Sequence, residues 1–282
     1  CIGQSAMGAG ASKRDGNKQL EKVSAAEREG IVVVPRQDRD HAVNTMVRSF
    51  CGYGADPEFA VDFCFWPLKD AELFKPLPQQ EDGTFKQNPD HEACYRYFFT
   101  FALTEIVYSG IVFGIKKEDG DGYAAITVVR PPGCKETMWT AIKAMNKLGW
   151  SMPPWEDGKR DYRFKQTKIR TDEVTKLQGK IHKESCAQKH WYVYIVAVDP
   201  AQQGKKYGKR LLTLINSLAD RDGAPIYLDT VGERNIAVYT KMGYKVIKQY
   251  TSCEGMEDKI GGPPLTVGGG MAGMRRDPVK KL

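Results

Sequence analysis

The stretch of sequence best suited to chemistry is a short turn rich in glycine and lysine, placed between a predicted strand and a predicted helix. Its residues are Gln203, Gly204, Lys205, Lys206, Tyr207, Gly208 and Lys209. The start of a helix offers backbone N–H groups without acceptors and the positive end of the helix dipole, so it attracts anions. The glycines let the backbone approach a ligand, and the lysines with Arg210 favour a phosphate. The turn therefore predicts a site for a phosphorylated cofactor.

Two common phosphate-binding patterns do not fit this turn. A Walker loop needs four residues between its first glycine and Gly-Lys, followed by a hydroxyl residue. Here three residues separate Gly204 from Gly208, and Arg210 stands where the hydroxyl is required. The dinucleotide-binding fingerprint fails because Lys206 occupies the place of its second glycine. The turn is thus predicted to be a pyrophosphate cradle of another kind.

The elements on either side of the turn are clear in the hydrophobic pattern. Residues 191–198 are apolar on both faces, which is typical of a central strand covered on both sides. Leu211, Ile215 and Leu218 recur at helical spacing after the turn, and Gly223 closes that helix. A strand over 226–231, a short helix over 235–242 and a strand over 244–250 follow.

The first half of the chain predicts a smaller set of elements. Residues 31–34 form a strand, and Asp38 is expected to cap a helix whose buried face is Ala42, Val43, Met46, Val47 and Phe50. A helix over 91–108 precedes a hairpin with strands at 110–115 and 123–129. Met138, Ile142 and Met145 give a helical stripe, and a basic helix ends near residue 185. Residues 51–90 and 150–158 are predicted to be irregular.

This order predicts an α/β (α+β) fold with a mixed, partly antiparallel central sheet flanked by helices. We expect a flexible leader over 1–29, one domain over 30–252 with its cofactor-binding core at 190–250, and a Gly/Pro-rich tail over 253–282. The tail is expected to add a final strand at 271–276, at the edge of the sheet.

The stretch from Val198 to Leu212 resembles the acetyl-CoA motif of the GNAT superfamily of acyl-CoA-dependent N-acetyltransferases. The residues from Asn235 to Tyr239, with Met242, Gly243 and Tyr244, are similar to the second signature of that superfamily. The two signatures lie in the family's order and spacing. The resemblance is close over residues 190–250 and loose upstream, and it implies a GNAT-like fold.

The resemblance also implies roles for individual residues. Gln203 matches the first position of the motif, and the amides from Gly204 to Lys209 would cradle the pyrophosphate of acetyl-CoA. The backbone at the end of the central strand, at Val196, Ala197 and Val198, would pair with the pantetheine arm. Asn235 would contact the cofactor, and Tyr239 would protonate the leaving thiolate. The chain departs from the family at Lys206, where a glycine is usual; the Cβ narrows the approach, and the ammonium offsets this.

Acyl transfer to an amine needs a neutral amine and a proton for the departing thiolate. A phenol suits the second task, although Tyr239 could instead simply pack its helix against the sheet. The general base is left open among His190, Asp229 and Glu105, each of which also has a structural explanation, and a water chain.

Composition excludes little. The net charge of +7 and the pI near 8.9 are compatible with an anionic ligand. The basic helix between Lys165 and Lys183 is better explained as a solvated face than as a nucleic-acid site. Seven scattered cysteines without C-x-x-C or zinc spacing favour free thiols in a reducing compartment, so we expect no metal and a cytoplasmic location. We also expect no membrane partner.

Taken together, the sequence predicts an N-acetyltransferase that transfers an acetyl group from acetyl-CoA to a primary amine. A small-molecule acceptor is favoured over a protein lysine or N-terminus. The alternative of another class is an acyl-CoA-binding module without catalysis. Acceptor identity, acyl-chain preference and oligomeric state are not determined at this level.

Overall fold

The computed structural model describes residues 15–51, 64, 89–134, 137–148, 160–262, 264 and 271–279. The predicted irregular segments at 51–90 and 150–158 lie mostly outside the described residues. Within the described part, no helix is both long enough and apolar enough to cross a membrane.

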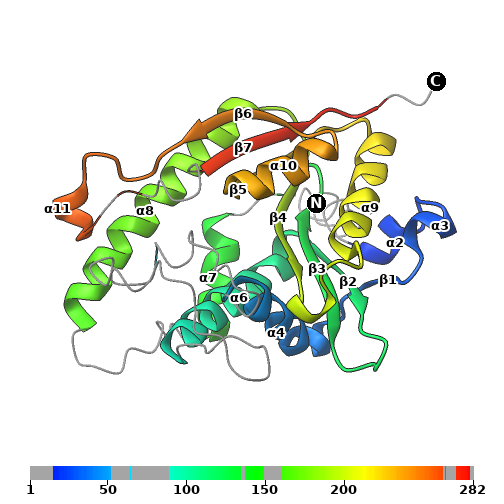
Figure 1. Ribbon diagram of the computed structural model, residues 1–282, viewed down its shortest axis with the longest axis horizontal. Helices are drawn as coiled ribbons and strands as arrows, with labels where there is room; N and C mark the ends of the chain where they lie inside the picture. Colours follow the sequence, from blue (N-terminus) through cyan, green and yellow to red (C-terminus); the bar gives the residue numbers. More distant parts are fainter. Residues whose placement is uncertain are drawn as a thin grey trace, which may run out of the picture.

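A seven-stranded mixed sheet runs through the centre of the molecule (Figure 1). Its strands lie in the order β1-β2-β3-β4-β5-β7-β6, and only β4 and β5 are parallel. The strands are β1 (Ile31–Val33), β2 (Ile111–Lys116), β3 (Tyr123–Arg130), β4 (Trp191–Val198), β5 (Ile226–Val231), β6 (Lys245–Tyr250) and β7 (Met271–Arg276). The predicted mixed, partly antiparallel sheet is confirmed.

Helices cover both faces of this sheet. They are α2 (Gly16–Leu20), α3 (Ala25–Arg28), α4 (Arg39–Phe50), α6 (Pro89–Ser109), α7 (Met138–Leu148), α8 (Arg160–Ser185), α9 (Tyr207–Asp222), α10 (Glu233–Lys241) and α11 (Glu257–Ile260), with 3-10 turns η1 (Arg36–Asp38) and η3 (Pro200–Gln202). One core cluster joins the apolar stripe of α9 to the sheet, and a second joins α4 and α6 to the opposite face. Figure 1 shows α9 and α2 lying apart from α4 and α6 across the strands.

The structure corrects two sequence expectations in the first half of the chain and confirms a third. The described part of the predicted leader 1–29 is helical, because Asp15 and Ser24 cap α2 and α3 and because Leu20 and Val23 are buried in the core. Asp38 does precede α4, but its carboxylate accepts the Tyr123 hydroxyl at 2.8 Å and does not cap the helix. Of the five apolar residues expected on the inner face of α4, the four from Ala42 to Val47 are buried, and Phe50 is partly buried against the same core cluster.

Two further expectations are wrong because contacts between residues far apart in the sequence decide the outcome. The stripe predicted for 138–145 is wrong at Met138, which is 77% exposed, while the small Ala144 is buried. The strand at 271–276 has the predicted bounds but is not an edge strand. It inserts between β5 and β6, where its small and apolar residues Met271, Ala272 and Gly273 face buried neighbours. The exposed, lysine-bearing β6 is the edge instead.

A β-bulge in β4 sets which side chains reach which face. Val128 of β3 pairs with Ile195 and Val129 pairs with Val193, so Tyr194 is the extra residue. Before the bulge, Trp191 and Val193 pack on the α9 side; after it, Ile195 joins the cluster on the α4 side. The strand is thus covered on both faces, as its sequence predicts.

We expect Gly110→Ala to lower the free energy of unfolding by about 3 kcal/mol, because an added Cβ would lie 2.3 Å from the Val129 carbonyl oxygen and force the α6–β2 junction to move. The matched control is Gly179→Ala in α8, where nothing lies within 4 Å of the new Cβ. This control should raise stability by about 0.5–1 kcal/mol. Urea unfolding of both variants checks the pair; equal effects would contradict the packing described at Gly110.

Candidate functional site

The parallel strands β4 and β5 separate soon after they start. Their pairing comprises Trp191 with Ile226, Tyr192 with Tyr227 and Val193 with Leu228, and no later residue of β4 is paired with β5. The N–H of Asp199 donates to Ala124 on the β3 side, so by alternation Val196 and Val198 turn their backbone groups away from β3. Val198 N–H meets Ser49 Oγ at 3.2 Å. Beyond Val193 the backbone groups that β4 turns away from β3 are thus not paired with β5, and we call the space between the two separated strands the wedge.

The wedge favours Val196 and Val198 over Ala197 for pairing with an extended ligand. Ala197 lies opposite Ile126 and directs its backbone groups toward β3. Of the three residues predicted to bind the pantetheine arm, Val196 and Val198 thus turn their backbone groups toward the wedge, and Ala197 turns its backbone groups toward β3.

The predicted cradle lies in the turn that connects β4 to α9. The first helical hydrogen bond of α9 runs from Arg210 N–H to the Lys206 carbonyl, so the N–H groups of Tyr207, Gly208 and Lys209 precede the helical ladder. Lys206 occupies the N-cap position and gives no side-chain cap, since an ammonium cannot accept a hydrogen bond. These amides point to where an anion would bind.

Backbone conformation explains why a glycine is usual at residue 206. Lys206 has φ 63°, in the left-handed region, and Gly204 has φ 82°. A residue with a Cβ pays about 1–2 kcal/mol for that conformation. The turn nevertheless keeps the shape of a cradle, with the lysine side chain exposed beside it.

The other residues of the turn are exposed or used locally. Gly208 lies so close to β4 that a Cβ would be 3.2 Å from Val198 Cγ2, which places the start of α9 against the end of the strand. Lys205 Nζ donates to Gln202 at 2.9 Å, and Gln203 and Lys209 are exposed. Arg210, expected to favour phosphate with the lysines, instead donates to the Glu29 carbonyl and lies 5.7 Å from the Tyr207 ring centroid.

Helix α10 brings the second predicted group to the same core cluster. Asn235 Nδ2 donates to the Val231 carbonyl at 2.9 Å and so ties α10 to the end of β5. Tyr239 is half-buried and meets Tyr244 edge-on, with ring centroids 5.7 Å apart.

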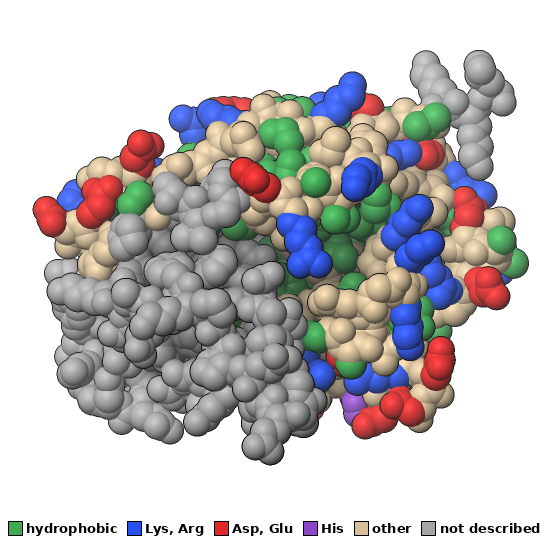
Figure 2. Space-filling view, viewed as in Figure 1, with side chains coloured by type: hydrophobic (Ala, Val, Ile, Leu, Met, Phe, Trp, Pro, Cys, Tyr) green, Lys and Arg blue, Asp and Glu red, His purple; other side chains and the backbone are tan. Residues whose placement is uncertain are grey.

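Partly buried apolar residues next to this cluster are Val196, Val198, Tyr207, Ile236, Tyr239 and Met242. These six come from β4, α9 and α10 with its C-cap residue, while a seventh such residue, Val33, belongs to β1. Figure 2 shows hydrophobic side chains gathered in a hollow beside α10, with lysine and arginine side chains around it.

On the opposite face of the sheet, three tyrosine hydroxyls converge on one carboxylate. Asp229 accepts from Tyr227 at 2.8 Å, from Tyr250 at 3.0 Å and from Tyr192 at 3.2 Å. We call these four residues the aspartate cluster. Burial raises the pKa of Asp229 to about 6, and the three hydroxyl donors limit the rise. Gly273 of β7 leaves room for the Tyr227 hydroxyl, since a Cβ there would lie 2.6 Å from it.

A buried ion pair adjoins the aspartate cluster. Glu105 of α6 accepts from Arg130 of β3 at 2.7 Å, and Ser109 bonds to both side chains. The Arg130 guanidinium lies 4.7 Å from the ring centroid of Tyr194 and 5.7 Å from that of Tyr192. The second carboxylate oxygen of Glu105, Oε1, is buried without a hydrogen-bond partner.

Two histidines complete this face. His190 Nδ1 lies 2.7 Å from the Gln188 carbonyl and therefore carries a hydrogen, so a neutral His190 accepts from His182 at Nε2, 2.6 Å away. Burial, then His190 and Arg130, lower the pKa of His182 to about 4. The His182 ring stacks on Tyr227 at 4.3 Å. His190 thus has both ring nitrogens engaged.

The structure brings all three candidate bases to one face of the sheet. Contacts run from Glu105 through Arg130 and Tyr192 to Asp229, and from Tyr227 through His182 to His190. Tyr239 and the cradle lie on the face that carries α9. The sequence analysis did not single out Arg130, His182, Tyr227 or Tyr250. The alternation of Tyr192 with Tyr194 and of Tyr227 with Asp229 was the available signal, because such residues share one face of a strand.

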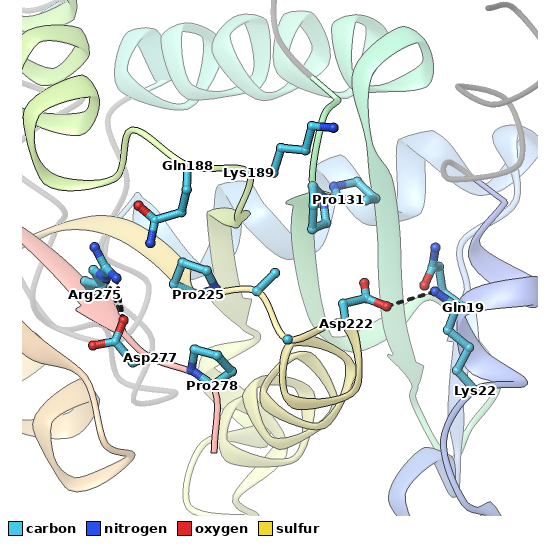
Figure 3. Close-up of a pocket in the computed structure, with 13 residues that line it drawn as sticks. Gln19, Lys22, Pro131, Gln188, Lys189, Asp222, Pro225, Arg275, Asp277 and Pro278 are labelled. Atoms are coloured by element: carbon cyan, nitrogen blue, oxygen red, sulfur yellow. Dashed lines mark hydrogen bonds and ion pairs between the residues drawn. The ribbon is translucent and has the colours of Figure 1, made fainter. Parts of the chain in front are cut away.

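A separate cavity of about 660 Å³ lies at the other pole of the sheet, beside the starts of β4 and β5 (Figure 3). Its lining includes Pro131, Gln188, Pro225 and Pro278. Its two carboxylates are matched by cations, Asp222 by Lys22 at 3.1 Å and Asp277 by Arg275 at 2.6 Å. The cavity is thus remote from the cradle, and its lining carries one further cation, Lys189. Within the described part of the chain, no group of three or more metal-binding side chains converges.

Comparison with known proteins agrees with this arrangement. Residues 168–244 match the acetyltransferase (GNAT) family. An N-acetyltransferase of Schizosaccharomyces pombe, described as uncharacterised, is 27% identical over 154 residues, which cover 55% of this chain and 60% of that protein. The match therefore spans less than two thirds of the relative's length.

Two solved structures share the fold at low identity. The C-terminal condensation domain of Ebony, solved with beta-alanyl-dopamine, has a TM-score of 0.51 and 11% identity, covering 88% of this chain and 97% of that one. A putative arylalkylamine N-acetyltransferase 7 from the mosquito Aedes aegypti has a TM-score of 0.50 and 9% identity, covering 88% and 86%. At these identities the likeness shows the fold alone.

The environment of Asp229 predicts a pH-dependent stability. The pKa of Asp229 is about 6 in the folded chain against a usual 3.8, so the folded state holds more protons between these values. Its stability should therefore fall as pH rises from about 4 to 6, by on the order of 2–3 kcal/mol. Asp229→Asn lacks this titration, so its unfolding free energy relative to the parent should rise over that range. Urea unfolding at pH 4, 5, 6 and 7 measures this; a constant difference would contradict the raised pKa.

Proposed function

We propose that this chain, which carries an acetyltransferase domain of the GNAT family, transfers an acetyl group from acetyl-CoA to a primary amine of a small molecule. The observation that carries the proposal is the open wedge between β4 and β5, which leads from the amides at the start of α9 to the middle of the sheet. An extended ligand with an anionic end and an amide-bearing arm matches both parts of it.

The cofactor side is assigned to the turn and to β4. The amides of Tyr207, Gly208 and Lys209 would hold the pyrophosphate, with Lys205, Lys206 and Lys209 supplying positive charge. Gln203 and Gly204 would shape the approach. The pantetheine arm carries amide groups that can pair with the backbone of Val196 and with the carbonyl of Val198, whose N–H donates to Ser49, as an added strand pairs with a sheet edge. Asn235 would hold the far side of the wedge through α10.

Tyr239 is assigned as the general acid. It lies half-buried against the core cluster against which Val196 and Val198 also pack, on the face of the sheet that carries the cradle, and we assign it as the proton donor to the leaving thiolate. A phenol stays protonated at neutral pH and can give its proton to a thiolate. The aspartate cluster is reached from the opposite face, which leaves that face to the acceptor.

The acceptor is assigned as a small molecule because the polar groups at the end of the wedge are half-buried among aromatic rings. A narrow primary amine can reach them, whereas a folded protein surface cannot unless its lysine is well extended. The names of the two fold neighbours, one solved with beta-alanyl-dopamine and one called an arylalkylamine N-acetyltransferase, are in keeping with this choice. The alternative is an acyl-CoA-binding module that does no chemistry, motivated by the strained Lys206.

We expect acetyl-CoA to bind saturably in a calorimetric titration and ATP to bind at least about 100-fold more weakly, because ATP has the phosphates but no arm to pair with β4. Desulfo-coenzyme A, which keeps both parts, should bind like acetyl-CoA. If ATP and acetyl-CoA bind equally, or if neither binds, the wedge is not a coenzyme A site.

We expect Tyr239→Phe to lower kcat by about 10²–10⁴-fold and to leave the acetyl-CoA Kd within about twofold, since only the proton for sulfur is removed. Tyr244→Phe is the matched control. It removes a hydroxyl that donates to Asn216 at 3.0 Å and should cost about 1 kcal/mol of stability without changing kcat. Thiol release with phenethylamine or spermidine measures the rate. If Tyr239→Phe is as active as the parent at every pH, Tyr239 is not the general acid. If the parent acetylates no primary amine, the chain is the acyl-CoA-binding module without catalysis.

A further inference from the structure

We propose that Asp229, held by three tyrosine hydroxyls where β4 and β5 part, is the counter-ion and general base for a cationic amine acceptor. The inference rests on the proposed function and selects one residue from the three candidates that the structure gathers. It assigns a role to the whole aspartate cluster, which neither the cradle nor Tyr239 uses.

Position is the first argument. Tyr192 and Tyr227 form the second of the three residue pairs that join β4 to β5, and the last pair is Val193 with Leu228. Asp229 is the next residue of β5, so the cluster lies at the closed end of the wedge. From Val198 to Val193 the strand spans roughly 17 Å, the path open to an extended arm that starts at the cradle. The reacting end of the cofactor therefore arrives beside Asp229.

Charge is the second argument. The Glu105 carboxylate and the Arg130 guanidinium neutralise each other at 2.7 Å. Asp229 accepts only tyrosine hydroxyls, and no lysine or arginine of the described residues forms an ion pair with it. The ionised cluster thus carries one unmatched negative charge in a half-buried place. A bound ammonium supplies the missing partner, and the neighbouring rings of Tyr192 and Tyr227 favour a cation.

Access separates Asp229 from the other two candidates. Glu105 is 2% exposed and already bound to Arg130 and Ser109. His190 has one ring nitrogen on Gln188 and the other on His182. Asp229 and Tyr192 keep partial exposure, so a ligand can touch them. The groups facing Asp229 are Tyr192 from β4, Tyr227 from β5 and Tyr250 from β6, and beyond them lie Glu105 from α6, Arg130 from β3 and His182 from α8.

The proton steps balance in this arrangement. The ammonium gives one proton to the Asp229 carboxylate, directly or through the Tyr192 hydroxyl, which donates to Asp229 as it accepts from nitrogen. The neutral amine then forms the C–N bond to the acetyl carbon. As the C–S bond breaks, Tyr239 gives its proton to sulfur, and the second proton leaves the new amide nitrogen and restores Tyr239. The net products are the amide, the thiol and one proton released from Asp229 to water.

The activity test compares Asp229→Asn with the parent, using phenethylamine and spermidine as acceptor probes between pH 5 and 9. For the parent, kcat/KM should rise with pH through about 6 as Asp229 ionises. In Asp229→Asn this rise with pH, the acidic limb of the pH profile, should be absent. Its kcat/KM should fall at least about 100-fold, and its Kd for acetyl-CoA should stay within about twofold of the parent value. Asp172→Asn, an exposed carboxylate of α8 paired with Lys168, is the control and should behave like the parent.

Tyr250→Phe keeps the carboxylate and removes one of its donors, so it tests the role even if Asp229→Asn does not fold. Losing a hydrogen bond to the charged form raises the pKa of Asp229, and the limb should move to higher pH while the maximal rate is largely kept. A merely structural role of the cluster would change stability and leave the limb where it is. An unmoved limb in Tyr250→Phe, or parent rates in Asp229→Asn, overturns the proposal.

A binding measurement separates this inference from the proposed function. The ¹³C-carboxyl signal of Asp229 is followed through a pH titration with and without phenethylamine or spermidine, with 2-phenylethanol as the neutral analogue. Both amines' ammonium forms should lower the pKa of Asp229, and the alcohol should not. If the amines shift the pKa of Asp229 but are not acetylated, Asp229 binds the amine and the proposed transferase function is wrong. If the amines are acetylated but the pKa of Asp229 does not shift, the transferase function stands and the proposed role of Asp229 is wrong.

Discussion

The parting of β4 from β5 after three residue pairs is the constraint on which the rest of the structure depends. Each strand keeps a full ladder on its other side, β4 with β3 and β5 with β7, so the sheet holds together around the opening. Backbone groups along the second half of β4 then face a wedge and not a neighbouring strand. The Val198 N–H already donates to Ser49, but the backbone groups of Val196 pair with neither β3 nor β5, and such groups are costly to leave without partners, so the wedge is best explained as a place for an extended ligand.

The bulge at Tyr194 makes the two faces of this wedge different. It shifts the alternation of β4, so that Tyr192, Tyr194 and Ile195 lie toward the face covered by α4, α6 and α8, while Val196 and Val198 lie toward α9. Apolar surface and a helix start therefore meet on one side, and titratable side chains meet on the other. Cofactor and acceptor can approach from opposite faces and react where the strands part.

The distribution of buried charge follows the same division. The α9 face carries lysines that are exposed around the cradle, where an anion would be solvated by amides. The other face holds Glu105, Arg130 and Asp229 within reach of aromatic rings, where one carboxylate is matched by a cation and the other by hydroxyls alone. An enzyme that must bind a polyanion and deprotonate a cation has use for both environments, and the sheet keeps them apart.

Local spacing alone determined much of this protein. The apolar run at 191–198, the turn after it, the stripe of α9 and the hairpin of β2 and β3 all depend on residues close in sequence, and each lies where the pattern placed it. The cradle could be nominated from the turn for the same reason, whereas the role of Tyr239 came from the resemblance of its helix to the second GNAT signature.

Tertiary structure decided what depends on distant partners. The bulge arises from the register of β3 against β4, the place of β7 from its pairing with β5 and β6, and the use of Arg210 from its contact with Glu29. Sequence could list His190, Asp229 and Glu105 as separate candidates, but only strand pairing brought them together and surrounded Asp229 with tyrosines. Such contacts join residues far apart in the chain, and no local periodicity encodes them.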